Sequence, residues 1–218
     1  MKRCFVLILA LVFCLSLTAC SADPAETAPA SQEPEPATPL NRGAVNGNIY
    51  TNKSMKLRFD LPSGWSFYSE DEIAEINNMT KEMYESADLQ DAVAASGQFI
   101  DFFAASSSNL DNVNLIIQPA NAKVSDMTER EIFESSEESY RSQFAGAGME
   151  IKTYEVLTAK FCGAEKAVLH METAMSGITL QEYQLWIRTD PNYTAVVTVS
   201  STSITDPQTI LDYFTPYN

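Results

Sequence analysis

Hydrophobic and polar residues alternate in several stretches of the chain, a period-two pattern that is typical of half-buried strands. The alternation is clear in residues 55–61, 151–157, 164–173, 180–189 and 194–201, and the shorter stretches 48–51, 99–104 and 113–117 also have the composition of strands. Short segments rich in Asn, Ser, Asp and Pro separate neighbouring stretches, and these residue types favour tight turns. We therefore expect neighbouring strands to pair as antiparallel hairpins.

Other stretches carry apolar residues at a helical spacing. Two of them begin with a capping box, Ser69 with Glu72 and Thr128 with Glu131, in which side chain and backbone satisfy each other at the start of a helix. Asp206 and Pro207 are typical of the start of a third, short helix. The predicted helices cover residues 69–86, 128–146 and 206–214. Paired strands with separate helices predict an α+β fold, a mainly antiparallel sheet flanked by helices.

The N-terminus differs from the rest of the chain. Lys2 and Arg3 precede an apolar run over residues 5–17, which is too short to span a bilayer and has the layout of a secretory signal. Residues 17–20, Leu-Thr-Ala-Cys, resemble the lipobox of bacterial lipoproteins. The resemblance implies that Cys20 receives a diacylglyceryl group and becomes the first residue of the mature protein. An ordinary secretory peptide whose cleavage site lies beside a cysteine is the alternative.

Residues 21–40 contain five prolines and four acidic residues, with no basic or aromatic residue. Such a segment cannot bury enough apolar surface to fold, and it is typical of a semi-extended tether with a reach of roughly 25 Å. We therefore divide the chain into a lipoprotein signal peptide (1–19), a lipidated cysteine with its tether (20–42) and a folded domain (43–218). This organisation predicts a location on the extracytoplasmic face of the cell membrane, or of the outer membrane in a diderm cell.

Charge and cysteine content limit the function classes further. The formal net charge is -15, which argues against nucleic acid as a partner and permits a cation or a basic partner. Cys4 and Cys14 leave with the predicted signal peptide and Cys20 is lipidated, so that Cys162 is left without a partner for an intrachain disulfide. We expect a monomer that its hydrophobic core alone stabilises.

The start of the folded domain carries a family resemblance. Residues 47–52, Gly-Asn-Ile-Tyr-Thr-Asn, and residues 57–65, which end in Leu-Pro-Ser-Gly-Trp, resemble the opening of PsbP-like domains. This group includes PsbP, Mog proteins and bacterial lipoproteins of DcrB type. The resemblance implies an α-β-α sandwich and a non-catalytic role in binding or assembling membrane-associated complexes. It transfers no catalytic residue to this chain.

Few residues suggest chemistry. His170 is the only histidine, and it lies eight positions from Cys162, without the short ligand spacing of structural zinc sites. No catalytic residue, metal ligand or cofactor site is predicted, and both residues are interpreted as part of the packing. Asparagines and an aspartate between two strands offer oxygen atoms that suit calcium, although a polar turn explains them equally. These residues are Asn109, Asp111, Asn112 and Asn114.

Together these features predict a lipid-anchored, non-catalytic binding or assembly module of the cell envelope. Its partners would be the membrane, through the lipid on Cys20, and an envelope protein complex. Two alternatives stay open: an envelope hydrolase with unrecognised carboxylates, and a calcium-dependent surface binder near Asp111. Trp65, Tyr68 and Trp186 are candidates for a binding surface if their side chains are exposed.

Overall fold

The computed structural model describes residues 41–86, 88–108, 110–121, 124–175, 177–188 and 192–217. The predicted signal peptide, Cys20 and most of the predicted tether lie outside these residues. No helix in the part of the chain described here has the length and apolar character needed to cross a membrane.

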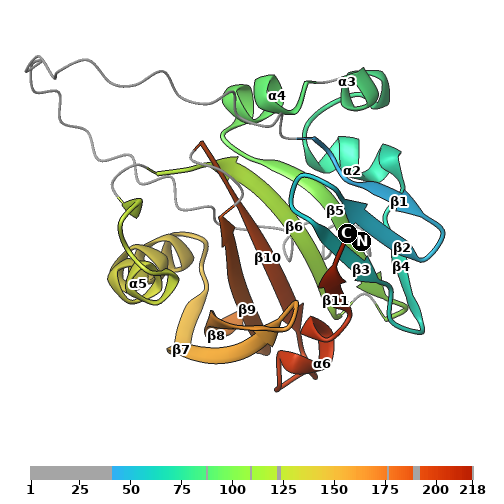
Figure 1. Cartoon of the computed structure of the whole chain (residues 1–218). Coiled ribbons are helices and arrows are strands. Elements are labelled where there is room, and N and C mark those ends of the chain that lie inside the picture. The colour runs from blue at the N-terminus through green and yellow to red at the C-terminus, as the bar shows by residue number, and fades with distance from the viewer. Residues whose placement is uncertain are drawn as a thin grey trace, which may run out of the picture.

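The elements follow one another along the chain in this order. Its first half contains β1 (Ala44–Asn46), β2 (Ile49–Asn52), β3 (Leu57–Asp60), β4 (Trp65–Phe67), α2 (Glu70–Ile76), α3 (Lys81–Ser86), α4 (Leu89–Ser96), β5 (Phe99–Ser106) and β6 (Asn112–Pro119). Its second half contains α5 (Glu129–Gly146), β7 (Glu150–Phe161), β8 (Ala164–Met175), β9 (Ile178–Arg188), β10 (Tyr193–Ser201), α6 (Gln208–Leu211) and β11 (Phe214–Pro216). Figure 1 shows these elements in place.

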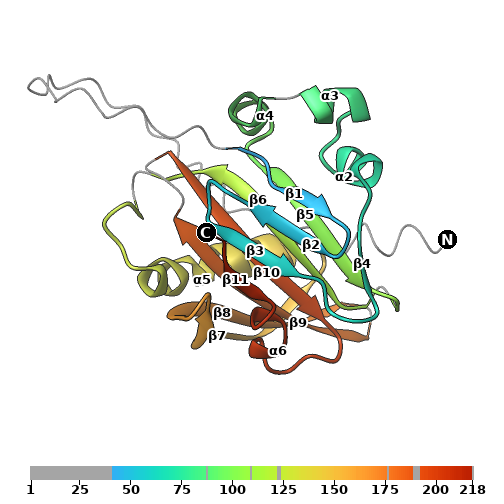
Figure 2. The same cartoon turned by 45° about the vertical axis from the view of Figure 1, so that its right-hand side comes forward.

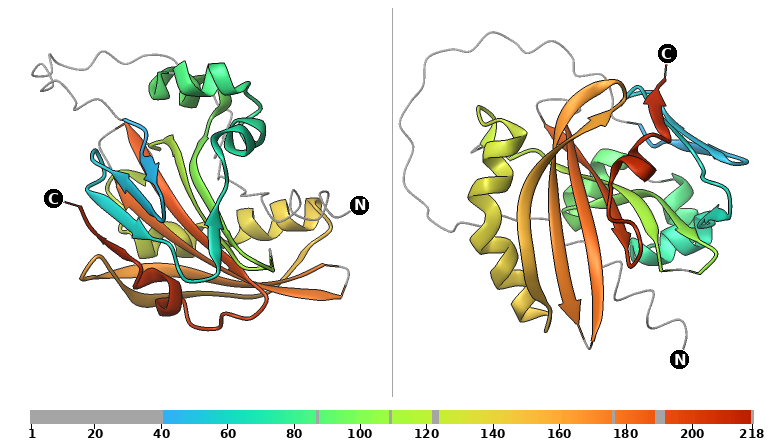
Figure 3. Two further views of the ribbon diagram at one scale, coloured as in Figure 1. Left: turned by 90° about the vertical axis from the view of Figure 1, so that its right-hand side faces the viewer. Right: turned by 90° about the horizontal axis from the view of Figure 1, so that it is seen from below.

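The strands form two antiparallel sheets. The large sheet has seven strands in the order β4-β5-β6-β10-β9-β8-β7, and the small sheet has four in the order β1-β2-β3-β11. The small sheet lies across one face of the large sheet (Figure 2), and α5 runs along the opposite face (Figure 3). The α+β class and the antiparallel pairing predicted from the sequence are confirmed. The separate small sheet is an addition that the hairpin pattern did not predict.

Two hydrophobic cores lie against the large sheet, and the larger of them also includes buried residues of α2 and α4. Between the two sheets lies the sheet core, where Phe59 stacks on Phe102 with ring centroids 5.4 Å apart and lies 4.5 Å from Phe214. Beneath α5 lies the helix core, where Phe133 meets Trp186 edge-on at 5.8 Å. Alternate residues of the central strands enter the two cores, so that the period-two pattern divides the sheet between two layers.

Both predicted capping boxes are confirmed, at Ser69 and at Thr128. The single helix predicted over residues 69–86 is wrong, because α2 ends at Ile76 and α3 begins at Lys81. The Asn77 side chain binds the backbone of Ile100 on β5 instead of continuing the helix, and Asn78 has a φ of 56°. Asparagine side chains compete for backbone groups in this way and favour helix ends. The α4 helix after α3 was also not predicted.

The predicted C-terminal helix is shorter than its pattern. It ends at Leu211, and Phe214 begins β11, where it lies opposite Phe59 of β3. The three apolar residues Ile210, Leu211 and Phe214 therefore lie in a single turn of helix and in the strand that follows it. Pairing with β3 places the Phe214 ring in the sheet core, and this tertiary contact outweighs the local helical pattern.

Side chains from α5 form hydrogen bonds with the outer edge strand of the large sheet. The long strand β7 forms this edge, and arginines from α5 donate to its backbone carbonyl groups. Arg130 Nη1 lies 2.9 Å from the oxygen of Val156, and Arg141 Nη1 lies 2.8 Å from that of Ile151. Such contacts occupy backbone acceptors that an edge strand would otherwise offer to a strand of another chain.

The sheet core generates a stability prediction. Phe59 is fully buried, and Phe59→Ala removes the ring that joins Phe102 to Phe214. We expect the free energy of unfolding of the full chain, measured by urea denaturation, to fall by about 3–5 kcal/mol. Tyr213→Ala, at a side chain that is 38% exposed, is the control and should change it by less than about 0.5 kcal/mol. Equal losses in both variants would contradict this packing.

Candidate functional site

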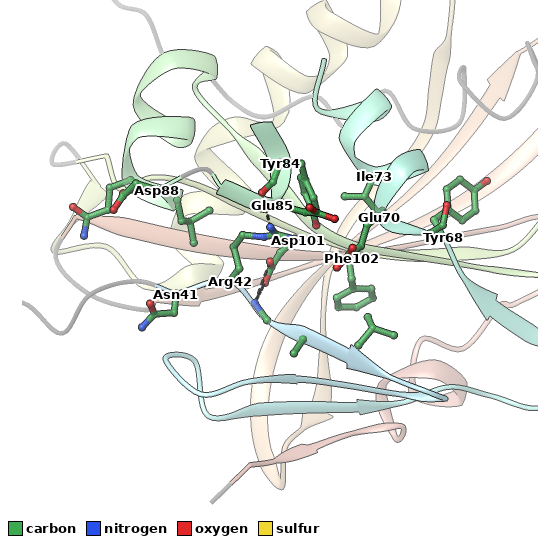
Figure 4. A pocket seen from close by; sticks show the side chains of 16 residues that line it. Asn41, Arg42, Tyr68, Glu70, Ile73, Tyr84, Glu85, Asp88, Asp101 and Phe102 are labelled. Carbon is green, nitrogen blue, oxygen red and sulfur yellow. Dashed lines mark hydrogen bonds between the residues drawn. The ribbon is translucent and has the colours of Figure 1, made fainter. Parts of the chain in front are cut away.

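A pocket of about 720 Å³ opens where the described chain begins. Its walls come from residues 41–45, from the α2–α4 region and from β5 (Figure 4). We call residues 41–45 the strap, because they lie across the end of the large sheet before β2 turns back. The strap continues directly from the predicted tether, so the pocket lies at the junction between tether and domain.

A β-bulge places the Asp101 carboxyl group at the base of this pocket. Ile100 lies opposite Ile116 and Phe102 lies opposite Leu115, which leaves Asp101 as the extra residue of β5. Bulges re-aim a side chain, and they are frequent near functional sites. The Asp101 side chain is directed towards the small sheet, and it is 5% exposed.

Three donors from the N-terminal part of the domain meet the Asp101 carboxyl group. All three donate to the same oxygen, Oδ2. The Gly43 backbone nitrogen lies 2.9 Å from it, the Tyr50 hydroxyl oxygen lies 2.5 Å from it, and Asn52 Nδ2 lies 3.1 Å from it. Burial raises the pKa of Asp101, and these hydrogen bonds oppose the rise without cancelling it. Burial, followed by the nearby charge of Asp101, also raises the pKa of Tyr50 well above its ordinary value.

Arg42 is the cation in the pocket wall. Its guanidinium carbon lies 3.5 Å from the centroid of the Tyr84 ring, and Nη1 donates to the Tyr84 carbonyl oxygen at 2.6 Å. The Tyr84 ring stacks on Phe99 at 5.5 Å, and burial raises the pKa of its hydroxyl to about 12. Such a guanidinium on an aromatic face is a cation–π contact. The other charged residues that line the pocket are Glu70, Glu85, Asp88 and Asp101.

The aromatic residues predicted as a binding surface do not come together. Tyr68 lines the pocket and lies 4.6 Å from Phe103. Trp65 is half-buried against the sheet core, whereas Trp186 is 7% exposed in the helix core, on the other face of the large sheet. Tyr68 alone among the three therefore contributes to the pocket wall. Cys20, the predicted lipidation site, lies outside the described residues.

Cys162 occupies the turn between β7 and β8. Cys162 and Gly163 have φ angles of 51° and 83°, and two consecutive positive values suit the tight hairpin turn of type I′. Burial raises the pKa of the Cys162 thiol to about 11. The thiolate is the reactive form of cysteine, so this environment disfavours its reactivity.

Both ring nitrogens of His170 are bound by side chains. Nδ1 lies 2.8 Å from Glu155 Oε1, and Nε2 lies 2.6 Å from Gln181 Oε1. The ring stacks on Tyr183 at 4.7 Å, on the opposite face of β8 from Leu169, as alternation predicted. Within the described residues, no three His, Cys, Asp or Glu side chains form a group that could hold a metal ion.

The residues considered for calcium diverge. Asp111 Oδ1 accepts hydrogen bonds from the hydroxyl groups of Ser201 and, at 3.1 Å, Ser203. Asn112 and Asn114 instead belong to β6, and both side chains are buried. Asn109 lies outside the described residues. The carboxylate of Asp111 thus binds hydroxyl groups at and after the end of β10. It does not share a ligand set with the two buried amides.

Glu182 of β9 is a second buried carboxyl group, 7% exposed. Burial raises its pKa to about 7, and it accepts a hydrogen bond of 2.7 Å from Gln184 Nε2. Gln184 Oε1 in turn accepts a bond of 2.6 Å from the Tyr140 hydroxyl of α5. Glu182 faces the α5 side of the sheet and Asp101 faces the small sheet, so the two carboxyl groups do not form the facing pair of a glycosidase.

The sequence contains a signal for Asp101 that the strand and helix patterns do not capture. Asp101 interrupts a stretch from Phe99 to Ala104 that is otherwise entirely apolar. A charged residue within such a stretch is rarely buried unless it has partners. The sequence therefore indicates a buried carboxyl group with hydrogen-bond partners at this position. Glu182 gave no comparable signal, because it lies in a strand where polar and apolar residues alternate.

The comparisons with known proteins show no family for this chain. No family model matches the chain, and no curated protein matches it. The solution structure of cyanobacterial PsbP (CyanoP) from Synechocystis sp. PCC 6803 is similar to it, at 13% identity and a TM-score of 0.45. The similarity covers 80% of this chain and 98% of that one. The α+β class itself is read from the two sheets and the helices.

The strap contacts predict the effect of one added methyl group. A Cβ atom on Gly43 would lie 2.2 Å from the Tyr50 ring, so Gly43→Ala displaces either the strap or the Tyr50 hydroxyl from Asp101. We expect the free energy of unfolding to fall by about 1–3 kcal/mol, with faster amide hydrogen exchange in residues 41–45. Gly146→Ala, where a Cβ meets nothing within 4 Å, is the control. Unchanged exchange in Gly43→Ala would contradict the clamped strap.

The buried Glu182 predicts a dependence of stability on pH. Its pKa is about 7 in the folded chain against an ordinary value of 4.5, so between these pH values the folded state holds a proton that the unfolded state has released. This group therefore lowers the free energy of unfolding as pH rises from about 4.5 to 7, by roughly 3 kcal/mol in total.

The corresponding measurement compares urea denaturation at pH 5 and pH 7.5. Glu182→Gln should lose the part of the decrease that comes from this group, while the exposed control Glu165→Gln should retain it. The same decrease in Glu182→Gln and in the unmodified chain would show that Glu182 is not the source.

Proposed function

We propose that this chain is a lipid-anchored binding or assembly module on the extracytoplasmic side of the cell envelope, and that it acts without catalysis. The support for the anchor is the N-terminal sequence, in which Cys20 follows a short apolar run and precedes a proline-rich tether. Two or three acyl chains on one residue make attachment to a membrane effectively permanent.

The observation that carries the binding role is the pocket at the tether junction. Its wall includes Arg42 and Gly43, which belong to the strap that follows the tether. The roughly 20 residues between Cys20 and the strap have a reach of roughly 25 Å. A partner held in the pocket would thus be held close to the membrane surface, as an assembly role requires.

The pocket chemistry favours a basic partner. Its wall carries three exposed acidic residues, Glu70, Glu85 and Asp88, against one arginine, and the chain as a whole has a net charge of -15. The contact of Arg42 with the Tyr84 ring supports this proposal, since it is a cation–π contact made within the same pocket wall. Lysine or arginine side chains of an envelope protein complex would be attracted by the same acidic wall. Asp101 contributes to that wall while its donors keep it in a structural role.

Site-specific crosslinking tests the proposal. A photo-crosslinking amino acid in place of Glu85, on the pocket wall, is placed in the full chain within its own membranes. We expect it to yield a covalent adduct with an envelope protein, and a yield that falls several-fold at high salt because charges are screened. Mass spectrometry identifies the partner, and the intact chain should begin at Cys20 and carry acyl chains.

Two controls make this result specific. The same amino acid in place of Ile178, on β9 and separated from β5 by β6 and β10, should give no such adduct. In Cys20→Ala the adduct at position 85 should be lost together with the chain from the membrane fraction. Identical adducts from both positions would contradict binding at the pocket, and an unlipidated chain in the membrane fraction would contradict the anchor.

A further inference from the structure

One edge of the small sheet lies in the wall of the pocket. This edge is β1, which pairs with β2 alone and has all three of its residues exposed. Ala44 and Val45 line the pocket, and the Val45 side chain is 49% exposed. The α2–α4 region lies on the side of β1 away from β2 (Figures 1 and 2), so the pocket lies between the edge of β1 and these helices.

The backbone N–H and C=O groups of Val45 point outwards from this edge. The Leu61 N–H donates to the Asn48 carbonyl oxygen at 2.8 Å, so β2 turns the backbone groups of Asn48 and of every second residue after it towards β3. Tyr50 belongs to that set, and Val45 is its partner on β1. The groups of Val45 are thus directed away from β2. Among the residues that the structure describes, none is hydrogen-bonded to either of them.

The three other edge strands of the described sheets have backbone groups that are bound or missing. In β4, the Trp65 N–H donates to the Pro62 carbonyl oxygen at 3.2 Å. In β7, the Gln208 side chain binds both the N–H and the C=O of Lys160, at 2.9 Å each. The third strand, β11, includes Pro216, which has no N–H. Proteins protect sheet edges in such ways from pairing with other chains, whereas β1 keeps a complete donor and acceptor beside a pocket.

The pocket wall that faces β1 is acidic. Glu70, Glu85 and Asp88 come from α2, α3 and the residue before α4, and all three are exposed. Lys81 Nζ lies 3.8 Å from Glu85 Oε1, but such an exposed pair is weak. Arg42, the cation of the wall, is already engaged in the cation–π contact described above. Charge therefore favours basic side chains in the space between β1 and the helices.

We propose that β1 binds an extended segment of a basic partner protein as an additional strand. The inference rests on the proposed function and names the way in which that partner is held. The backbone of the segment pairs with Val45, and lysine or arginine side chains at every second position point to the acidic wall. Addition of a strand to a free sheet edge is a common mode of peptide recognition, in which backbone bonds give affinity and alternate side chains give specificity.

Charge disfavours other occupants of this edge. Residues 21–40 of the chain contain no basic residue, and a second copy carries the same net charge of -15. Either would bring further negative charge to the acidic wall, where like charges repel. The pocket of about 720 Å³ has the size of an ordinary ligand pocket. A basic segment of a different protein is therefore the occupant that the charges select.

Synthetic peptides test the pairing directly. A fluorescein-labelled octapeptide of alternating lysine and threonine is titrated with the full chain in a non-ionic detergent, and binding is measured by fluorescence anisotropy. We expect binding that weakens with salt, and none when glutamate replaces lysine. Two further peptides carry N-methyl groups on the lysine amides or on the threonine amides. One should bind about tenfold more weakly than the other, because an added strand turns only every second amide towards the edge.

A proline variant removes the donor from the protein side. Val45→Pro deletes the outward N–H and no bond to β2, which is a position where edge strands tolerate proline. It should weaken binding of the lysine–threonine peptide about tenfold. Thr158→Pro, at an exposed outward position of the distant edge strand β7, is the matched control and should leave binding unchanged. If Val45→Pro loses the near-UV circular dichroism of the folded chain, the methylated peptides decide alone.

Three results would overturn strand addition. These are no binding by the lysine–threonine peptide, equal binding by the two methylated peptides, and a folded Val45→Pro variant that binds as well as Thr158→Pro. The crosslinking experiment keeps this inference apart from the proposed function. With the photo-crosslinking amino acid at position 85, an adduct that Val45→Pro leaves unchanged would overturn strand addition and retain the basic partner. The absence of any adduct would overturn the proposed function itself.

Discussion

The carboxyl group of Asp101 joins the two sheets, and the N-terminal part of the domain depends on this joint. A buried carboxyl group is costly unless donors surround it. Here the donors come from Gly43, Tyr50 and Asn52, so the same contacts that satisfy the acid fix the strap and β2 against β5. The bulge that re-aims Asp101 is therefore what allows the small sheet to dock where it does.

The pocket follows from the same joint. With the Gly43 N–H held at Asp101, Arg42 is placed over Tyr84, and the strap closes one wall of the pocket. The backbone approaches the Tyr50 ring so closely that only glycine fits at position 43. The same hydrogen bonds thus hold the small sheet in place and shape the pocket. They lie where the predicted tether joins the domain.

Local signals were sufficient for much of the fold and for little of the candidate site. Capping residues and period-two alternation predicted α5 and the hairpins of the large sheet, because both depend on neighbours in the sequence. The small sheet requires Phe214 to pair with Phe59, far away along the chain, and no local pattern encodes such a contact. The position of Glu182 on the α5 side likewise depends on the register of β9, since a shift of one residue would send its side chain to the other face.

The two buried carboxyl groups differ in how far the fold supplies them with hydrogen-bond donors. Asp101 accepts three hydrogen bonds from its own chain, and a group satisfied in this way stabilises the fold and has little left to offer a ligand. Glu182 accepts one, from Gln184, and lies among amides and a hydroxyl that lack partners. Polar groups that a fold buries without satisfying reduce its stability. The number of donors, more than burial itself, therefore explains why Asp101 can join the two sheets.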